Sequence, residues 1–213
     1  MSENYEKSVT EQGNPARPTG TAGEEMLSRM NESHYAVTGW ALDFFKFSGN
    51  ENVLDIGCGG GETLRRMSEK INNGHLTGVD YSAVSVKMSS EHNNKSISCG
   101  KMDIVEASVE NLPFADDSFD KIITVESFYF WNNPQEDLKE VYRVLAENGT
   151  FLIVADIYGG AELSENETEN IRKYNLFNPT PNEFENLLEN AGFKNVKIHT
   201  KSGTNWICAE GRK

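Results

Sequence analysis

The sequence predicts a doubly wound α/β fold with a mostly parallel seven-stranded sheet and an antiparallel last strand. Strand-like and helix-like segments alternate along most of the 213 residues, which is typical of a parallel sheet covered by helices. A glycine-rich turn joins the first predicted strand to the next helix. A short Lys-Ser-Gly turn separates the last two predicted strands, which indicates a hairpin and so an antiparallel strand.

Seven short segments are predicted as strands because they are apolar or β-branched and lie between turn signals. In chain order they are residues 51–56, 75–79, 102–107, 119–125, 150–155, 195–200 and 205–209. The apolar run of residues 119–125 is nearly continuous, which favours a central strand that is buried on both faces.

The helices between the strands are predicted from apolar residues at helical spacing and from signals at the helix ends. Residues 62–71 form the first of them, and Ser82 can cap the next. Asn133 is expected to cap a third helix, with Pro134 at its first position and Asn148-Gly149 as its end.

A further helix is predicted over residues 178–192. Thr180 and Glu183 form a capping box at its start, and Gly192 ends it. Two more helical segments, residues 24–31 and 36–47, precede the first strand.

The domain organisation predicted is a flexible polar tail over residues 1–23 and a single domain over residues 24–213. The tail lacks the apolar core of a secretory signal, and no apolar run approaches the ~20 residues that span a bilayer. The three cysteines, Cys58, Cys99 and Cys208, suit neither a disulfide framework nor a metal site. We therefore expect a cytoplasmic protein without a membrane span or a bound metal.

The formal net charge is −13, from 33 acidic and 20 basic residues. An acidic surface repels phosphate backbones, and the basic residues are scattered along the chain. Nucleic acid is therefore not expected as a partner.

The most informative segment is the glycine loop of residues 53–63, with the sequence VLDIGCGGGET. A dinucleotide-binding fingerprint of the form Gly-x-Gly-x-x-Gly, counted from Gly57, would place its third glycine at Glu62. A carboxylate there would repel a pyrophosphate. Asp55, two residues before Gly57, suits instead a cationic ligand such as the ammonium and sulfonium of S-adenosylmethionine.

A second acidic residue, Asp80, ends the second predicted strand. Its carboxylate can accept two hydrogen bonds from ribose hydroxyls. NAD enzymes place an acid at the same point, so Asp80 alone does not separate the two cofactors.

Four motifs in order carry a resemblance to a known family: VLDIGCGGG, GVDYS, ENLPFADDSFD and the helix that contains Glu140 and Leu145. The chain resembles the class I S-adenosylmethionine-dependent methyltransferases, in the branch that includes the ubiquinone/menaquinone C-methyltransferases (methyltransferase type 11). The resemblance covers about residues 51–155. It implies a Rossmann-like sheet and transfer of a methyl group from S-adenosyl-L-methionine, which leaves S-adenosyl-L-homocysteine.

The resemblance also implies a role for individual residues. Asp55 would organise the glycine loop and the methionine ammonium, Asp80 would bind the ribose, and Tyr81 would pack on the adenine. The full set of cofactor residues implied is Asp55, Gly57, Gly59, Asp80, Tyr81, Ser108, Val109, Val125 and Glu126. Ser108 departs from the family, which often has Asp at this position to accept from the adenine amino group.

The acceptor is expected to be a small molecule that binds outside the carboxyl ends of the strands. Glu126 and Tyr129, just after the fourth strand, and His34 are the candidate catalytic residues. The resemblance implies that the helical segment of about residues 24–47 acts as a lid. The oligomeric state does not follow from the sequence.

Two alternative functions remain open at this stage. One is a regulatory protein that binds S-adenosylmethionine without transferring the methyl group. The other is an NAD-dependent oxidoreductase, which Glu62 in place of the third glycine disfavours.

Overall fold

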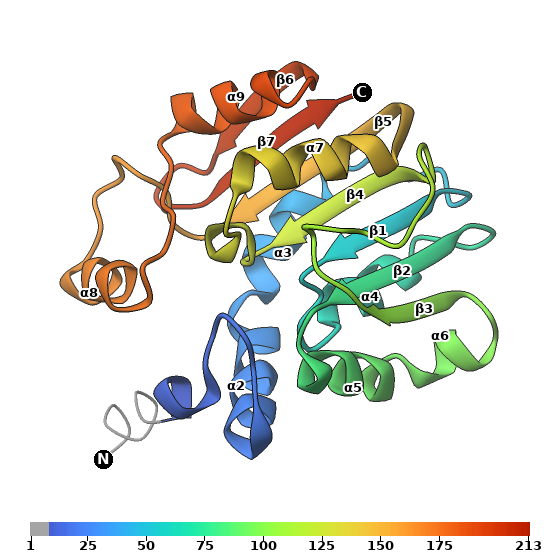
Figure 1. The fold of residues 1–213 in the computed structure, drawn as a ribbon, viewed down its shortest axis with the longest axis horizontal. Helices are drawn as coiled ribbons and strands as arrows, with labels where there is room; N and C mark the ends of the chain where they lie inside the picture. The colour runs from blue at the N-terminus through green and yellow to red at the C-terminus, as the bar shows by residue number, and fades with distance from the viewer. Residues whose placement is uncertain (1–8) are drawn as a thin grey trace.

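The computed structural model describes residues 9–213, in which seven strands form one sheet in the order β3-β2-β1-β4-β5-β7-β6 (Figure 1). The strands are β1 Asn52–Ile56, β2 His75–Asp80, β3 Met102–Glu106, β4 Phe119–Val125, β5 Leu145–Ala155, β6 Lys194–Thr200 and β7 Ile207–Arg212. β1 to β5 are parallel, and β7 pairs antiparallel with both β5 and β6. The predicted fold class is confirmed.

Helices cover both faces of the sheet (Figure 1). They are α2 Gly20–Ser33, α3 Tyr35–Leu42, α4 Glu62–Ser68, α5 Ala83–His92, α6 Asn94–Ser98, α7 Pro134–Val144, α8 Glu165–Tyr174 and α9 Pro181–Asn190, with a short 3₁₀ helix at Phe128–Phe130. None of the helices in residues 9–213 is long and apolar enough to cross a membrane.

The core has two layers because alternate residues of each strand point to opposite faces of the sheet. Leu54, Ile122 and Ile153 pack against the apolar sides of α7 and α9 on one face. Val53 and Ile123 pack against α3 and α4 on the other. Both layers are fully buried, which explains why the central strands are almost continuously apolar.

Two of the three predicted N-terminal caps form side-chain hydrogen bonds. The Ser82 hydroxyl accepts from the backbone N–H of Ser85, and Thr180 forms the predicted capping box with Glu183. The Asn133 side chain makes no capping hydrogen bond; instead its backbone N–H donates to the Asp137 carboxylate of α7 at 3.3 Å. Asn133 therefore occupies the predicted N-cap position before Pro134, but without a side-chain capping hydrogen bond.

The structure also differs from the sequence-based boundaries in the second half of the chain. α7 ends at Val144, and β5 begins at once, five residues before the predicted start at residue 150. α8 was not predicted, although Ser164 and Glu167 form a capping box at its start.

The N-terminal region is more ordered than the polar composition suggested. Residues 1–8 of the predicted tail lie outside the described residues, but residues 9–13 are helical and α2 begins at Gly20. The Ser82 hydroxyl donates to the Pro18 carbonyl at 2.6 Å, and the Tyr81 hydroxyl donates to the Ala16 carbonyl. Residues 15–18 are therefore docked on the body of the domain.

Candidate cofactor and acceptor site

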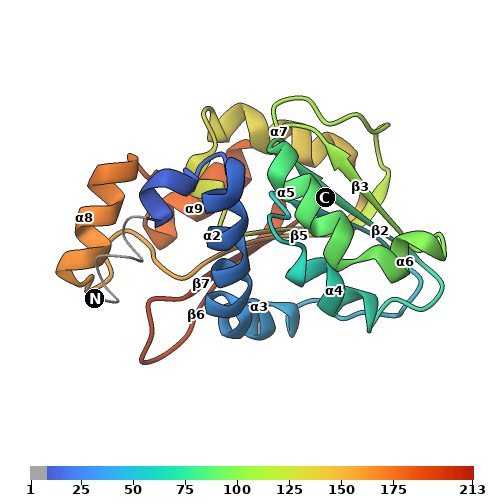
Figure 2. The same cartoon turned by 90° about the horizontal axis from the view of Figure 1, so that it is seen from below.

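A cavity of about 450 Å³ lies at the carboxyl ends of the central strands. Its floor is the glycine loop after β1, and its outer wall is formed by α2 and by residues 15–18. Figure 2 shows α2 between α8 and α5, and Figure 1 shows α2 below the carboxyl ends of the central strands. The position agrees with the rule that ligands of open α/β sheets bind outside the carboxyl ends of the strands.

The glycine loop is fixed to the neighbouring strand and has no room for side chains. The backbone N–H groups of Gly57 and Cys58 donate to the Val79 carbonyl at 2.8 and 3.0 Å. Gly57, at φ +72°, adopts a conformation that residues with a Cβ rarely take, and a Cβ there would collide with the Ser127 hydroxyl. The loop therefore presents bare backbone to the cavity.

Asp80 holds the glycine loop and the start of α5 together. Its carboxylate accepts from the backbone N–H of Gly59 at 3.0 Å and from that of Ser82 at 2.9 Å. Burial raises its pKa, and these hydrogen bonds oppose the rise. Each carboxylate oxygen keeps a second lone pair, so Asp80 can still accept from a ligand.

Asp55 is the least compensated carboxylate of the cavity. Its side chain is 1% exposed, and its Oδ2 atom has no hydrogen-bond partner within residues 9–213. Burial, together with the nearby charge of Asp80, raises the pKa of Asp55 to about 8. A cationic group of a ligand would supply the missing partner.

The remaining predicted cofactor residues also line the cavity: Tyr81, Ser108, Val109, Val125 and Glu126. The Tyr81 ring is 39% exposed, and the Arg17 guanidinium lies 5.5 Å from its centre. The Ser108 hydroxyl accepts from the backbone N–H of Glu110 at 3.3 Å, so it also serves a local turn.

His34 and Glu126 lie at the other end of the cavity. Glu126 follows β4 with φ +55° and is 7% exposed. The Tyr129 hydroxyl donates to its Oε2 atom at 2.8 Å. Tyr129 does not itself line the cavity, and it therefore reaches the site through Glu126.

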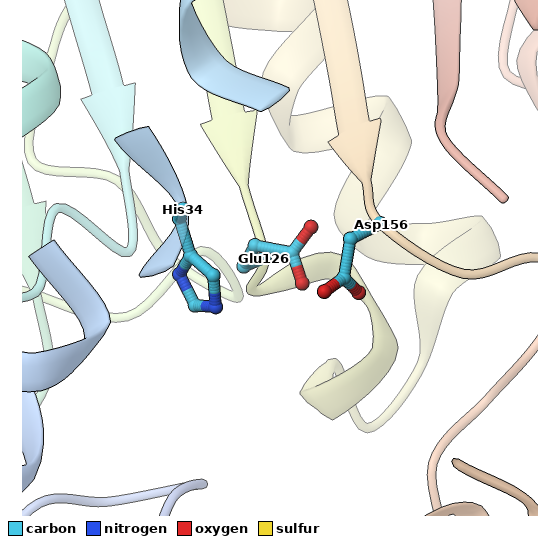
Figure 3. Close-up of side chains that lie close together, drawn as sticks. All are labelled: His34, Glu126 and Asp156. Carbon is cyan, nitrogen blue, oxygen red and sulfur yellow. The ribbon is translucent and has the colours of Figure 1, made fainter. Parts of the chain in front are cut away.

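Asp156, directly after β5, joins these residues and was missed from the sequence. His34, Glu126 and Asp156 each offer an atom within 4.8 Å of the other two (Figure 3). Burial raises the pKa of Glu126 to about 7. Burial and the charge of Glu126 raise the pKa of Asp156 to about 7, and burial lowers the pKa of His34.

The described cavity wall contains five carboxylates but no lysine or arginine. The acidic residues are Asp55, Glu62, Asp80, Glu110 and Glu126. The cavity is thus suited to ligands that are neutral or cationic overall and poorly suited to ligands with a net negative charge.

Fold and site together define a methyltransferase domain of class I, with a glycine loop after β1 and an acid at the end of β2. A family model described as a methyltransferase domain matches residues 54–153. Residues 54–153 therefore carry a methyltransferase domain, and over this stretch the chain is similar to the class I enzymes that use S-adenosylmethionine. The unpartnered Asp55 oxygen and the bare loop at Gly57 fit this cationic cofactor.

Comparison with known proteins agrees with this assignment. The chain is 28% identical to the chloroplastic 2-methyl-6-phytyl-1,4-hydroquinone methyltransferase 1 of Oryza sativa subsp. japonica, over 72% of this chain and 44% of the relative. It is 25% identical to the ubiquinone/menaquinone biosynthesis C-methyltransferase UbiE of Geotalea daltonii, over 75% and 77% of the two chains. It thus spans less than half of the rice protein.

Among solved structures, a SAM-dependent methyltransferase from Aquifex aeolicus has the same fold. It superimposes with a TM-score of 0.71 at 17% identity, over 89% of this chain and 97% of that one.

Proposed function

We propose that this chain transfers the methyl group of S-adenosylmethionine to a neutral or cationic small molecule. The observation that carries the proposal is the single cavity that runs from the glycine loop to Glu126 and His34. A cofactor on the loop and an acceptor at the far end would share one enclosed space, as direct transfer requires.

The cofactor residues would act as follows. Asp55 would pair with the methionine ammonium, and the backbone at Gly57 and Gly59 would lie against the methionine moiety. Asp80 would accept from the ribose hydroxyls, while Tyr81, Ser108 and Val109 would enclose the adenine. Val125 and Glu126 would flank the methionine portion. The cofactor supplies an electrophilic methyl group, so the protein mainly has to align the acceptor and exclude water.

The acceptor would bind between the polar cluster and the aromatic wall. Glu126 and His34 offer acceptors for a hydroxyl or amine hydrogen, and Tyr129 positions Glu126. Tyr35, Phe130 and Trp131 line the cavity nearby and suit a planar or apolar body. We further propose that the protein acts in the cytoplasm, without nucleic acid, and that α2 and α3 form the lid.

Calorimetric titration with S-adenosylmethionine, S-adenosylhomocysteine and NAD tests the cofactor directly. We expect micromolar binding of the two sulfur compounds and no binding of NAD. A screen of quinol, phenol and amine acceptors then measures turnover. NAD binding alone would refute the proposal. Tight cofactor binding without turnover on any acceptor class would favour a regulatory protein instead.

A further inference from the structure

Three potential metal ligands from separate elements converge beside the acceptor end of the cavity, which His34 and Glu126 line. His34 lies between α2 and α3, Glu126 follows β4, and Asp156 follows β5. One nitrogen or oxygen atom of each lies within 4.8 Å of the others. Figure 3 shows the Glu126 carboxylate between the His34 ring and the Asp156 carboxylate.

One carboxylate oxygen at the centre of the cluster accepts no hydrogen bond. The Tyr129 hydroxyl donates to Oε2 of Glu126, but the buried Oε1 atom has no hydrogen-bond partner in the described part of the chain. Asp156 is a second carboxylate beside it, and no lysine or arginine lines the described cavity. Two neighbouring carboxylates, one buried and one partly buried, favour a shared proton or a cation between them.

The positions of the two carboxylates are set by the sheet. β4 and β5 are adjacent and parallel, with Val125 opposite Val154, so both acids extend from the same edge. The Glu126 backbone N–H donates to the Val154 carbonyl at 3.0 Å, which ties the turn after β4 to β5. Ligands on such rigid elements need little reorganisation to bind an ion.

We propose that His34, Glu126 and Asp156 bind a divalent first-row transition metal ion such as Mn²⁺ or Zn²⁺. Two carboxylates match the charge of a divalent ion. The imidazole favours transition metals over Mg²⁺ and Ca²⁺, which prefer oxygen ligands alone.

The ion would define the class of acceptor and so deepens the proposed function, on which this consequence rests. Three protein ligands leave a divalent ion with open coordination positions, as in catalytic zinc sites. An oxygen atom of the acceptor could fill one of them, and coordination would lower the pKa of a hydroxyl at that position. Phenols and hydroquinones are the acceptors that fit.

The test is metal binding itself, on the full chain after chelator treatment and dialysis. Mn²⁺ is titrated and the free ion is followed by electron paramagnetic resonance, with Zn²⁺ and Mg²⁺ as competitors. We expect one Mn²⁺ per chain, displaced by Zn²⁺ more readily than by Mg²⁺. Asp156→Asn and His34→Gln should each weaken binding at least about tenfold, since even outer-shell changes cost 10–100-fold.

A matched pair of controls comes from the surface of β2 and β3. His75 and Asp103 form an exposed imidazole–carboxylate pair at 2.9 Å, and His75→Gln and Asp103→Asn should leave Mn²⁺ affinity unchanged. Asp156→Glu keeps the ligand chemistry and should retain more affinity than Asp156→Asn.

Binding of S-adenosylhomocysteine separates this inference from the proposed function. Asp156 is not among the cofactor residues, so Asp156→Asn should still bind it, which also verifies folding. Normal S-adenosylhomocysteine binding with no uptake of millimolar Mn²⁺ or Zn²⁺ would overturn the metal site and leave a shared proton between the carboxylates. Metal uptake that Asp156→Asn does not weaken would overturn it too. If the wild type does not bind S-adenosylhomocysteine at all, the proposed function is refuted instead.

Discussion

The uncompensated carboxylate of Asp55 makes a testable link between stability and cofactor binding. In the folded protein its pKa is about 8, against 3.8 for an exposed aspartate. Between these values the folded state keeps a proton that the unfolded state releases, so stability falls as pH rises from about 4 to 8. Replacement by asparagine removes this titration and should stabilise the protein, increasingly so towards pH 8.

The magnitude follows from the width of that interval. One pH unit corresponds to about 1.4 kcal/mol, so the advantage of Asp55→Asn grows by at most about 3 kcal/mol between pH 5 and pH 7. For a domain of this size, 1 kcal/mol shifts Tm by roughly 2–4 °C. The difference in Tm between variant and wild type should therefore widen by up to about 6–12 °C.

Thermal unfolding of both proteins at a series of pH values measures this difference, because their other titrating groups largely cancel. Glu106→Gln, at an exposed position of β3, is the control and should show no such widening. S-adenosylhomocysteine should stabilise the wild type more than the variant, since its ammonium would pair with Asp55. A constant difference in Tm, or a less stable variant at pH 7, would refute the reasoning.

Three further changes have defined outcomes. Asp80→Ala should weaken S-adenosylhomocysteine binding by at least about 100-fold in calorimetry, since two charge-assisted hydrogen bonds contribute roughly 1.5–3 kcal/mol each, while Asp103→Asn should bind normally. Gly57→Ala should abolish cofactor binding because its Cβ collides with the Ser127 hydroxyl. Gly100 has a similar φ of +74° but open space around it, so Gly100→Ala should keep cofactor binding and lower the free energy of unfolding by only about 1 kcal/mol. Ser82→Ala loses a helix cap and the hydrogen bond to Pro18, so it should destabilise the fold by about 1–2 kcal/mol. It should also speed cofactor release in stopped-flow measurements, and an unchanged release rate would contradict a role of the Ser82–Pro18 bond in holding the cavity wall.

The floor of the cavity was predictable because its chemistry is local. The glycine loop, Asp55 and Asp80 lie within about 30 residues of each other, and each has a backbone or charge requirement that few residue types satisfy. The capping box of Thr180 was visible for the same reason. The capping box of Ser164 and Glu167 is an equally local signal and marks the start of α8.

The acceptor end was only partly predictable because it depends on the order of the strands. Asp156 follows an ordinary apolar strand, and nothing beside it in the sequence indicates a site. It becomes informative once β5 lies next to β4, because the carboxyl ends of adjacent parallel strands meet. The docked residues 15–18 were missed since their main contacts use backbone carbonyls, which every residue type possesses.

Those docked residues would affect how fast ligands can exchange. Pro15, Ala16 and Pro18 form part of the cavity wall, and a few hydrogen bonds hold them. Such a wall can detach without unfolding the sheet, so escape of spent cofactor becomes a local opening event with its own rate. The two prolines restrict the detached segment and reduce the entropy lost when it closes again. The turnover rate would then depend on residues that never touch the acceptor.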